Sequence, residues 1–313
     1  MPVRQWRFVP GIVAGRKEET TVERIVVHFL VVSWAALPIL WRAAPAPAEA
    51  QETPAPAVSY QHIQGIQYGS GDPFQTVDLY LPDSARRRST AVFVLNHGSG
   101  NKLPFVQRFA ERGYPVLFVN VRRREPYPRP VEDAFCALAW AHAHAREYGF
   151  DPSRILALGH SGGAVLAAHL GTFDERARYM WGCSSPLPRE RWLLGVASIA
   201  GIFDYRTEEE FGAPHNAYTP RYFGGTRESV PAAWEEASPI TWAGRGDPPF
   251  LLVHGTADVM VLPIQSERSA ALLRRAGVEV ELVLVPGADH NGILCDATFE
   301  AVERLLARLA SGP

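Results

Sequence analysis

The sequence predicts an α/β protein whose central sheet is mostly parallel and carries helices on both faces. From Tyr60 onward, short apolar segments typical of strands alternate with longer segments of helical periodicity. Most of the strand segments are continuous apolar runs, which indicates strands buried on both faces of the sheet. Alternating strands and helices favour a parallel sheet, because each parallel connection needs a crossover that a helix supplies.

The strand and helix segments can be placed in order along the chain. A first strand over 75–82 alternates apolar and polar residues and ends at a proline, so we expect one exposed face. The apolar strands that follow are expected over 91–96, 114–121, 155–158, 193–200, 249–253 and 278–285. The helices are expected over 104–112, 131–148, the Ala- and Leu-rich run after residue 163, 263–276 and 297–309.

The composition is that of one large globular domain. The 313 residues are 47% hydrophobic and 20% charged, and the formal net charge is −2. A net charge this close to zero gives no reason to expect a nucleic-acid partner. The basic clusters 86–88 and 122–124 are short and flanked by turn residues, so we expect them to be solvated loop charge.

A turn at 159–163 has the sequence Gly-His-Ser-Gly-Gly, and it lies between an apolar strand and a helix. Gly-x-Ser-x-Gly in this setting is typical of a nucleophile turn, which lifts the serine hydroxyl above the edge of the sheet. The glycines are needed because side chains there would collide with the neighbouring strand and helix. The motif therefore predicts that Ser161 is the nucleophile of a serine hydrolase.

Two further candidates follow later strands. Asp258 comes just after the strand at 249–253, and His290 comes just after the strand at 278–285. Ligands of such sheets bind beyond the carboxyl ends of the strands, so we expect both side chains near Ser161. A serine needs a histidine to accept its proton, and that histidine needs a carboxylate to orient it. We predict the triad Ser161, Asp258 and His290, with Asp204 as the alternative carboxylate.

The turn at 97–100 is the candidate partner of Gly162 in binding an oxyanion. Its glycines leave room for backbone N–H groups to approach a substrate. The expected donors are the backbone N–H groups of Gly98, Ser99 and Gly162. His97 and His254 precede glycines at strand ends, and we expect both to make local hydrogen bonds.

These motifs resemble the α/β-hydrolase fold, and within it the hormone-sensitive-lipase-like and BD-FAE-like carboxylesterases. The resemblance covers about residues 60–310 and rests on segments 77–82, 97–100, 125–133, 148–154, 159–163, 254–258 and 287–290. It implies an eight-stranded sheet and a hydrolase of carboxylic esters that needs no metal and no cofactor. Ser99 replaces a glycine that is usual in the oxyanion turn of those esterases. The same turn occurs in dienelactone-hydrolase-like and prolyl-oligopeptidase-like relatives.

Residues 202–247 interrupt the alternation of strands and helices. They are rich in Tyr, Trp, Pro, Gly and Glu and show no clear periodicity. Because they lie between two strands at the active-site edge, we predict a small cap; the alternative is an inert surface excursion. The candidate pocket residues are His160, for which a structural role is the alternative, together with Tyr205, Tyr218 and Trp234.

The amino-terminal part has the order of a secretory signal. Basic residues precede an apolar run of 17 residues at 25–41, and several Ala-x-Ala steps follow it. The run is shorter than the roughly 20 residues of a membrane span. We predict a signal peptide or an uncleaved anchor over 1–50, a linker over 51–59 and a catalytic domain over 60–313. The expected location is secreted or periplasmic, with membrane anchoring and a cytosolic protein as the alternatives.

The three cysteines show no Cys-x-x-Cys spacing. Cys136 falls in a helical apolar pattern and is expected to be a small core residue. Cys183 and Cys295 are the candidates for a disulfide if the protein is exported.

Taken together, the sequence predicts an exported esterase of small to medium carboxylic esters, with a small-molecule ester as its partner. A hydrolase of amides, peptides or lactones on the same fold is the first alternative. A non-catalytic binding module is the second, although such modules usually lose a member of the triad.

Overall fold

The computed structural model describes residues 57–69, 72–97, 101–172, 182–186, 193–207 and 218–311. The chain divides into two units, Met1–Pro54 and Ala55–Pro313, and every described residue belongs to the second unit. The predicted signal or anchor over 1–50 and the linker up to residue 56 lie outside the described residues.

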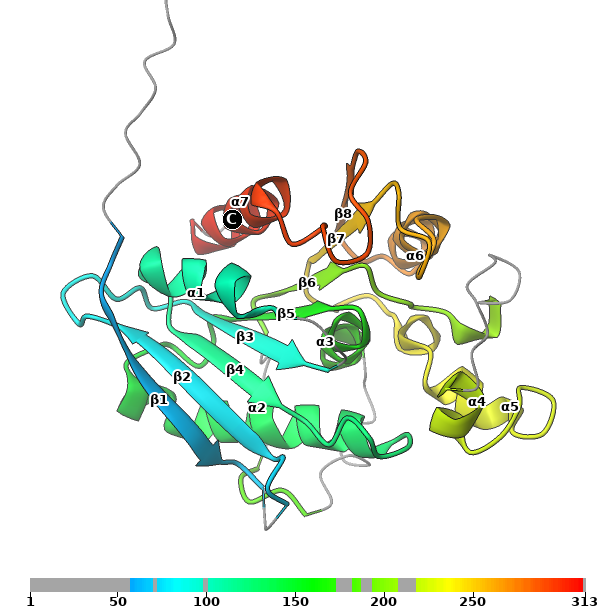
Figure 1. Ribbon diagram of the computed structural model, residues 1–313, viewed down its shortest axis with the longest axis horizontal. Helices are drawn as coiled ribbons and strands as arrows, with labels where there is room; N and C mark the ends of the chain where they lie inside the picture. Colours follow the sequence, from blue (N-terminus) through cyan, green and yellow to red (C-terminus); the bar gives the residue numbers. More distant parts are fainter. Residues whose placement is uncertain are drawn as a thin grey trace, which may run out of the picture. The chain divides into compact units, whose positions relative to one another are not determined.

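The described residues contain one sheet of eight strands, in the spatial order β1-β2-β4-β3-β5-β6-β7-β8 (Figure 1). Its strands are β1 (Tyr60–Gln67), β2 (Thr76–Pro82), β3 (Ala91–Asn96), β4 (Val116–Asn120), β5 (Ile155–His160), β6 (Gly195–Ile199), β7 (Phe250–Gly255) and β8 (Val280–Val285). β2 is antiparallel to both β1 and β4, and the pairs from β4 to β8 are parallel. The mostly parallel sheet predicted from the sequence is therefore confirmed.

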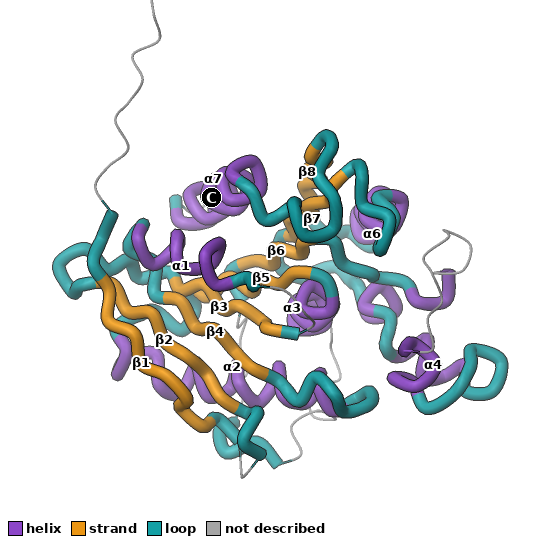
Figure 2. The backbone as a smooth tube through the Cα atoms, in the orientation of Figure 1, coloured by secondary structure: helices purple, strands orange, loops and turns teal. Residues whose placement is uncertain are grey.

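Helices cover both faces of this sheet (Figure 2). The long helices are α1 (Leu103–Glu111), α2 (Arg129–Tyr148), α3 (Gly162–Thr172), α6 (Ile264–Arg275) and α7 (Asp296–Ala310). α1 and α7 pack together on one face, where the rings of Phe109 and Phe299 lie 4.6 Å apart. α2, α3 and α6 bury their apolar side chains in the core of the other face. Within the described part of the chain, none of the helices has the length and hydropathy needed to cross a membrane.

The central strands supply side chains to both cores. In β3, Phe93 and Leu95 belong to the core under α2 and α3, whereas Val92 and Val94 belong to the core under α1 and α7. All four side chains are at most 1% exposed. Because successive side chains of a strand point to opposite faces, a strand covered on both faces must be apolar throughout.

The segment between β6 and β7 (residues 200–249) is here called the β6–β7 segment. Its described residues, 200–207 and 218–249, form only short helices. These are η2 (Tyr205–Thr207), α4 (Tyr218–Phe223), α5 (Pro231–Glu236) and η4 (Pro239–Trp242). Trp234, Phe223 and Ala237 form a small core of their own within it. The buried ring of His169 on α3 donates from Nε2 to the Ala237 carbonyl over 3.0 Å, which ties the segment to the main body.

The predicted pairing of Cys183 with Cys295 is wrong. Cys183 forms a disulfide with Cys136 on α2, and Cys295 is free. The reason is topological, because Cys183 and Cys136 belong to the core under α2 whereas Cys295 packs against the core on the opposite face of the sheet.

Candidate active site

The turn between β5 and α3 holds Ser161 in an unusual backbone conformation. Its φ is +57°, in the left-handed region that residues with a side chain rarely adopt. Its backbone N–H donates to the Ile199 carbonyl on β6 over 2.9 Å, which fixes the turn to the sheet. A Cβ at Gly159 would collide with the backbone of Gly163, and one at Gly163 would collide with the Leu95 carbonyl. The sequence forms this turn because glycine stands at both positions.

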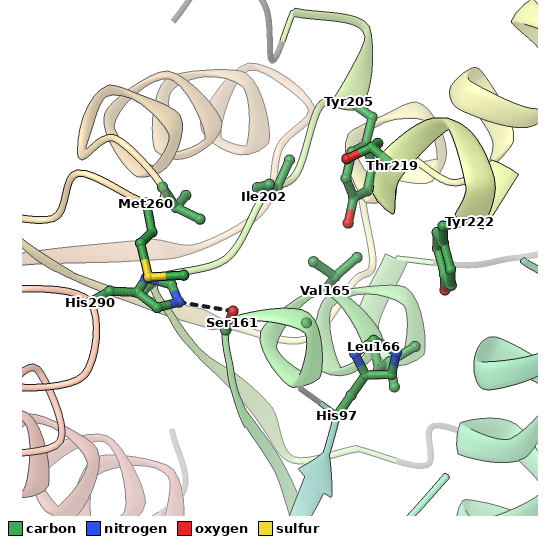
Figure 3. Close-up of a pocket in the computed structure, with 13 residues that line it drawn as sticks. His97, Ser161, Val165, Leu166, Ile202, Tyr205, Thr219, Tyr222, Met260 and His290 are labelled. Carbon is green, nitrogen blue, oxygen red and sulfur yellow. Dashed lines mark hydrogen bonds between the residues drawn. The ribbon is translucent and has the colours of Figure 1, made fainter. Parts of the chain in front are cut away.

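Three strand ends bring the predicted triad together. His290 Nε2 lies 2.9 Å from Ser161 Oγ, the contact marked in Figure 3, and His290 Nδ1 lies 2.7 Å from Asp258 Oδ2. Asp258 and His290 are 2% and 6% exposed. Nδ1 donates to the carboxylate, which leaves Nε2 without a hydrogen to accept one from the serine hydroxyl. The three side chains therefore form one directed chain of hydrogen bonds.

Several groups besides His290 contact the Asp258 carboxylate. Its Oδ1 accepts the backbone N–H groups of Met260 and Val261, each over 2.9 Å, and its Oδ2 lies 3.3 Å from His254 Nε2. Burial raises the pKa of Asp258, but the hydrogen bonds from His254, His290 and Val261 outweigh it and bring the pKa below its usual range. The side chain is therefore a carboxylate at neutral pH, as an orienting group must be.

His254 and His97, the two histidines near strand ends, differ in their hydrogen bonding. His254 is fully buried, and its Nε2 donates to the Val261 carbonyl over 2.8 Å, while the Ser266 hydroxyl lies 2.7 Å from Nδ1. The local hydrogen bonds expected for His254 are thus confirmed. Within the described residues, neither ring nitrogen of His97 has a hydrogen-bond partner, so the same expectation for His97 is wrong there. Burial, followed by the charges of Lys102 and Arg123, lowers the pKa of His97 to about 4.

A cavity of about 210 Å³ opens beside the Ser161 hydroxyl (Figure 3). Its polar lining comes from Ser161, His97, Thr219 and His290 together with the Tyr205 and Tyr222 side chains. The apolar lining consists of Gly162, Val165, Leu166, Ala200, Ile202, Met260 and Val261. The cavity therefore suits a small, largely apolar group placed next to the serine.

Only one of the four predicted pocket residues is seen to line this cavity. Tyr205 does so, whereas Tyr218 begins α4 with a side chain outside the described part. Trp234 is wrong as a pocket residue, because its 2% exposed ring fills the small core of the β6–β7 segment and donates to the Gly225 carbonyl. His160 is also wrong, because its ring is buried behind the turn, where Nε2 lies 2.6 Å from the His290 carbonyl oxygen. That bond is the structural role that was the alternative.

The remaining predicted groups can be placed in part. Gly162 lines the cavity as the first residue of α3, where backbone N–H groups have no partner within the helix. Gly98 and Ser99 lie outside the described residues. Asp204 is engaged by the Arg206 guanidinium at 2.8 Å, which removes it as the carboxylate alternative to Asp258. The described residues contain no group of three or more His, Cys, Asp or Glu side chains that could hold a metal ion.

Sequence reasoning missed most of the cavity wall. Val165 follows Ser161 by four residues on α3, so helical spacing alone places it on the same face. Val261 lies three residues after Asp258, in a loop that the Asp258 carboxylate holds. Ile202 and Tyr222 had no such signal, because the conformation of the β6–β7 segment depends on tertiary contacts.

Comparison with known proteins identifies the family of this chain. The chain matches the BD-FAE family over residues 77–273. Esterase LipC of Mycobacterium tuberculosis is 28% identical over 254 residues, which cover 76% of this chain and 61% of the relative. The chain spans 61%, 56% and 56% of the lengths of three curated relatives, which are all esterases or ester hydrolases by name.

Solved structures share the fold. A truncated carbohydrate esterase from gut microbiota has a TM-score of 0.68 at 22% identity, and the match covers 81% of this chain and 98% of the other. Esterase Est2 of the planctomycete Thermogutta terrifontis, with propionate bound, has a TM-score of 0.61 at 24% identity, covering 82% and 96%. The match over residues 77–273, the eight-stranded sheet and the serine turn together show that this chain belongs to the BD-FAE family of α/β-hydrolases.

Proposed function

We propose that this protein hydrolyses small to medium carboxylic esters through an acyl-enzyme on Ser161. The observation that carries the proposal is the hydrogen-bonded chain Ser161–His290–Asp258 beside an apolar cavity. A non-catalytic module has no use for a strained serine turn and a buried, oriented imidazole–carboxylate pair.

In the first half of the reaction, Ser161 Oγ attacks the ester carbonyl carbon and passes its proton to His290 Nε2. The Asp258 carboxylate accepts from Nδ1 and stabilises the imidazolium that forms. The carbonyl oxygen becomes negative and is stabilised by the Gly162 N–H together with N–H groups of the turn at 97–100. The alcohol then leaves with the proton from Nε2, and the acyl group stays on Ser161.

In the second half, water replaces the alcohol. His290 Nε2 takes a proton from the water, whose oxygen attacks the acyl carbon. The tetrahedral intermediate breaks the bond to Ser161 Oγ, which receives the proton from Nε2. The products are the free carboxylic acid and the unmodified enzyme.

The names of the relatives support an ester rather than an amide or a lactone as the substrate. LipC is called an esterase, and the Thermogutta structure carries propionate, a short carboxylate. The cavity of about 210 Å³ agrees with a short acyl or alcohol group. Because Ile202, Tyr205, Thr219 and Tyr222 line it, the β6–β7 segment acts as the small cap that selects this group.

Export of the protein is part of the proposal. The disulfide between Cys136 and Cys183 is typical of an oxidising compartment, which agrees with the signal-like order of residues 1–50. The protein then acts in the periplasm or outside the cell, or on a membrane that residues 25–41 anchor it to. Cell fractionation of the producing organism tests this, and an enzyme found with the cytosolic markers contradicts it.

The test of activity uses the full chain with 4-nitrophenyl acetate, butyrate and octanoate beside an aminoacyl 4-nitroanilide. We expect ester turnover that falls at least about a thousandfold in Ser161→Ala, because the nucleophile is lost. A fluorophosphonate should label the wild type and not this variant. Ser84→Ala, at an exposed loop position, is the matched control. Turnover or labelling that survives in Ser161→Ala contradicts the assignment, and amide turnover faster than ester turnover contradicts the substrate class.

A further inference from the structure

A second cavity adjoins the candidate active site. It has a volume of about 420 Å³ and is lined by residues 123–126, Arg221 and Tyr222. Tyr222 lines both cavities, so this residue is part of the wall between them. In Figure 3, Tyr222 extends from α4 on the far side of Val165 from Ser161. A group bound in the second cavity can therefore belong to a molecule whose other end lies at the serine.

Two distant parts of the chain build this second cavity. The Tyr127 N–H, in the loop after β4, donates to the Tyr222 carbonyl of α4 over 2.8 Å. The Tyr127 ring packs edge-on against Phe223 with the centroids 6.2 Å apart. The Tyr222 ring in turn lies 6.2 Å from the His97 ring, which belongs to the active-site cavity. The wall is thus held by a hydrogen bond and by ring contacts.

The lining of the second cavity is strongly cationic. Arg123, Arg124 and Arg221 carry three positive charges against the single negative charge of Glu125. In the described part of the chain, the guanidinium groups of Arg124 and Arg221 make no hydrogen bond or ion pair. The neighbouring Arg122 is different, because its guanidinium lies 2.7 Å from the fully buried Asp133 carboxylate and stabilises the fold.

Positive charge extends from this lining to the active site. The charges of Lys102 and Arg123 act on His97, where they add to burial in lowering its pKa. Among the described residues that line the active-site cavity, none is acidic. In the described linings of the two cavities, the one carboxylate that would repel a negatively charged substrate group is that of Glu125.

We propose that this second cavity, the arginine subsite, binds a carboxylate that the ester substrate carries away from its scissile bond. Arginine forks match the geometry of a carboxylate, and charge-assisted hydrogen bonds are stronger than neutral ones. The proposal rests on the proposed ester hydrolysis and names its substrate class, which is carboxylated esters. The expectation of solvated loop charge for 122–124 is wrong for Arg122, which pairs with the buried Asp133, whereas Arg123 and Arg124 are exposed as expected.

The test compares matched esters that differ in one charge. In the acyl arm, the 4-nitrophenyl monoester of glutaric acid is compared with 4-nitrophenyl pentanoate. In the alcohol arm, 4-carboxyphenyl acetate is compared with 4-methylphenyl acetate. The readout is the ratio of kcat/KM for the charged ester to that for the neutral ester, in the full chain and in Arg124→Gln, Arg221→Gln and the double variant.

In one of the two arms, we expect the ratio to fall about fivefold in each single variant and further in the double variant. The arm that responds identifies the side of the substrate that carries the charge. Raising the salt concentration should shrink the effect, because these charges are exposed. Arg221→Lys should keep only part of the ratio, because the charge stays but the fork is lost, and Arg304→Gln on α7 should keep all of it. A double variant with the wild-type ratio in both arms overturns the arginine subsite.

Binding to Ser161→Ala protein separates this proposal from the proposed function. The intact esters should bind it, and the charged ester of the responding arm should bind about fivefold more weakly when Arg221→Gln is added. Equal binding overturns the arginine subsite even when the wild type hydrolyses neutral esters well. Conversely, a loss of binding of the charged ester supports the subsite even if neither ester is turned over, in which case only the proposed hydrolysis fails.

Discussion

His254 and Asp258 are in contact at the same carboxylate oxygen that orients the candidate base. His254 Nε2 lies 3.3 Å from Asp258 Oδ2, which also accepts from His290 Nδ1 at 2.7 Å. The Nε2 of His254 must carry a hydrogen, because it also faces the Val261 carbonyl at 2.8 Å and a carbonyl only accepts. The Asp258 carboxylate is thus shared between the fully buried N–H of His254 and the imidazole proposed to take the serine proton.

This sharing predicts a loss of activity for His254→Phe. Without the donor, the Asp258 carboxylate loses one of the groups that fix its position against His290 Nδ1. We expect kcat/KM to fall about tenfold, because the carboxylate orients the imidazole less well.

Two variants test whether the effect belongs to the donor. His254→Gln keeps an N–H group and should restore much of the wild-type kcat/KM, whereas Ser266→Ala removes only the bond to Nδ1. An unchanged kcat/KM in His254→Phe would show that His254 does not position the Asp258 carboxylate.

The cavity wall predicts chain-length selectivity. Ile202 lines a cavity of about 210 Å³, and Ile202→Phe reduces the space beside Ser161. We expect the ratio of octanoate to acetate turnover, both as 4-nitrophenyl esters, to fall about tenfold, because a change of about one methylene in an apolar pocket is worth roughly 1–3 kcal/mol between substrates. Tyr205→Ala should shift the ratio the other way. Leu284→Phe, at an exposed position of the edge strand β8, is the control, and an equal loss for both esters would contradict the assignment of this wall.

Because His169 is buried, we expect the folded protein to lose stability in acid. Burial lowers its pKa to about 4, with the bond to the Ala237 carbonyl opposing this, whereas an unfolded histidine has a pKa of about 6.5. Between these values the unfolded state binds a proton that the folded state does not. Stability is therefore full above about pH 6.5 and is lost as the pH falls toward 4.

Urea unfolding at pH 7, 6 and 5 measures this effect. We expect the fall in the free energy of unfolding from pH 7 to pH 5 to be about 2 kcal/mol smaller in His169→Gln than in the wild type. His62→Gln, at an exposed position of β1, serves as the control. Identical pH slopes for His169→Gln and the wild type would exclude His169 as the cause.

The disulfide predicts a redox-dependent stability. Cys136 and Cys183 are 47 residues apart, and a crosslink of this span contributes roughly 2–4 kcal/mol. Reduction should lower the Tm of the wild type, and the double variant Cys136→Ala, Cys183→Ala should start from that lower value and not respond to reductant. Cys295→Ala should behave as the wild type does. A wild-type Tm that reductant leaves unchanged would argue against a stabilising bond.

The sequence predicted those parts of the fold that are encoded locally. Residues 91–95 are apolar throughout because both faces of the strand are covered, and the predicted bounds 91–96 match β3. Ser161, Asp258 and His290 were found because each follows a strand, and a parallel sheet brings such ends together.

Other parts depend on packing that local sequence does not encode. β1 was not delimited, because at the sheet edge it pairs only with β2 and no residue of it is buried. The cysteine pairing depends on which face of the sheet each residue reaches. His160 could be read as a pocket residue because chain proximity to Ser161 does not tell which way a side chain points.

The two non-glycine residues with a positive φ in the described ranges are Ser161, at 57°, and Ala200, at 52°. Both line the cavity, and they follow the adjacent strands β5 and β6. Glycine would relieve the strain at either position, so Ser161→Gly should yield an inactive protein that withstands heat better than the active one. Directed evolution that selected for heat resistance alone would therefore favour loss of the Ser161 side chain.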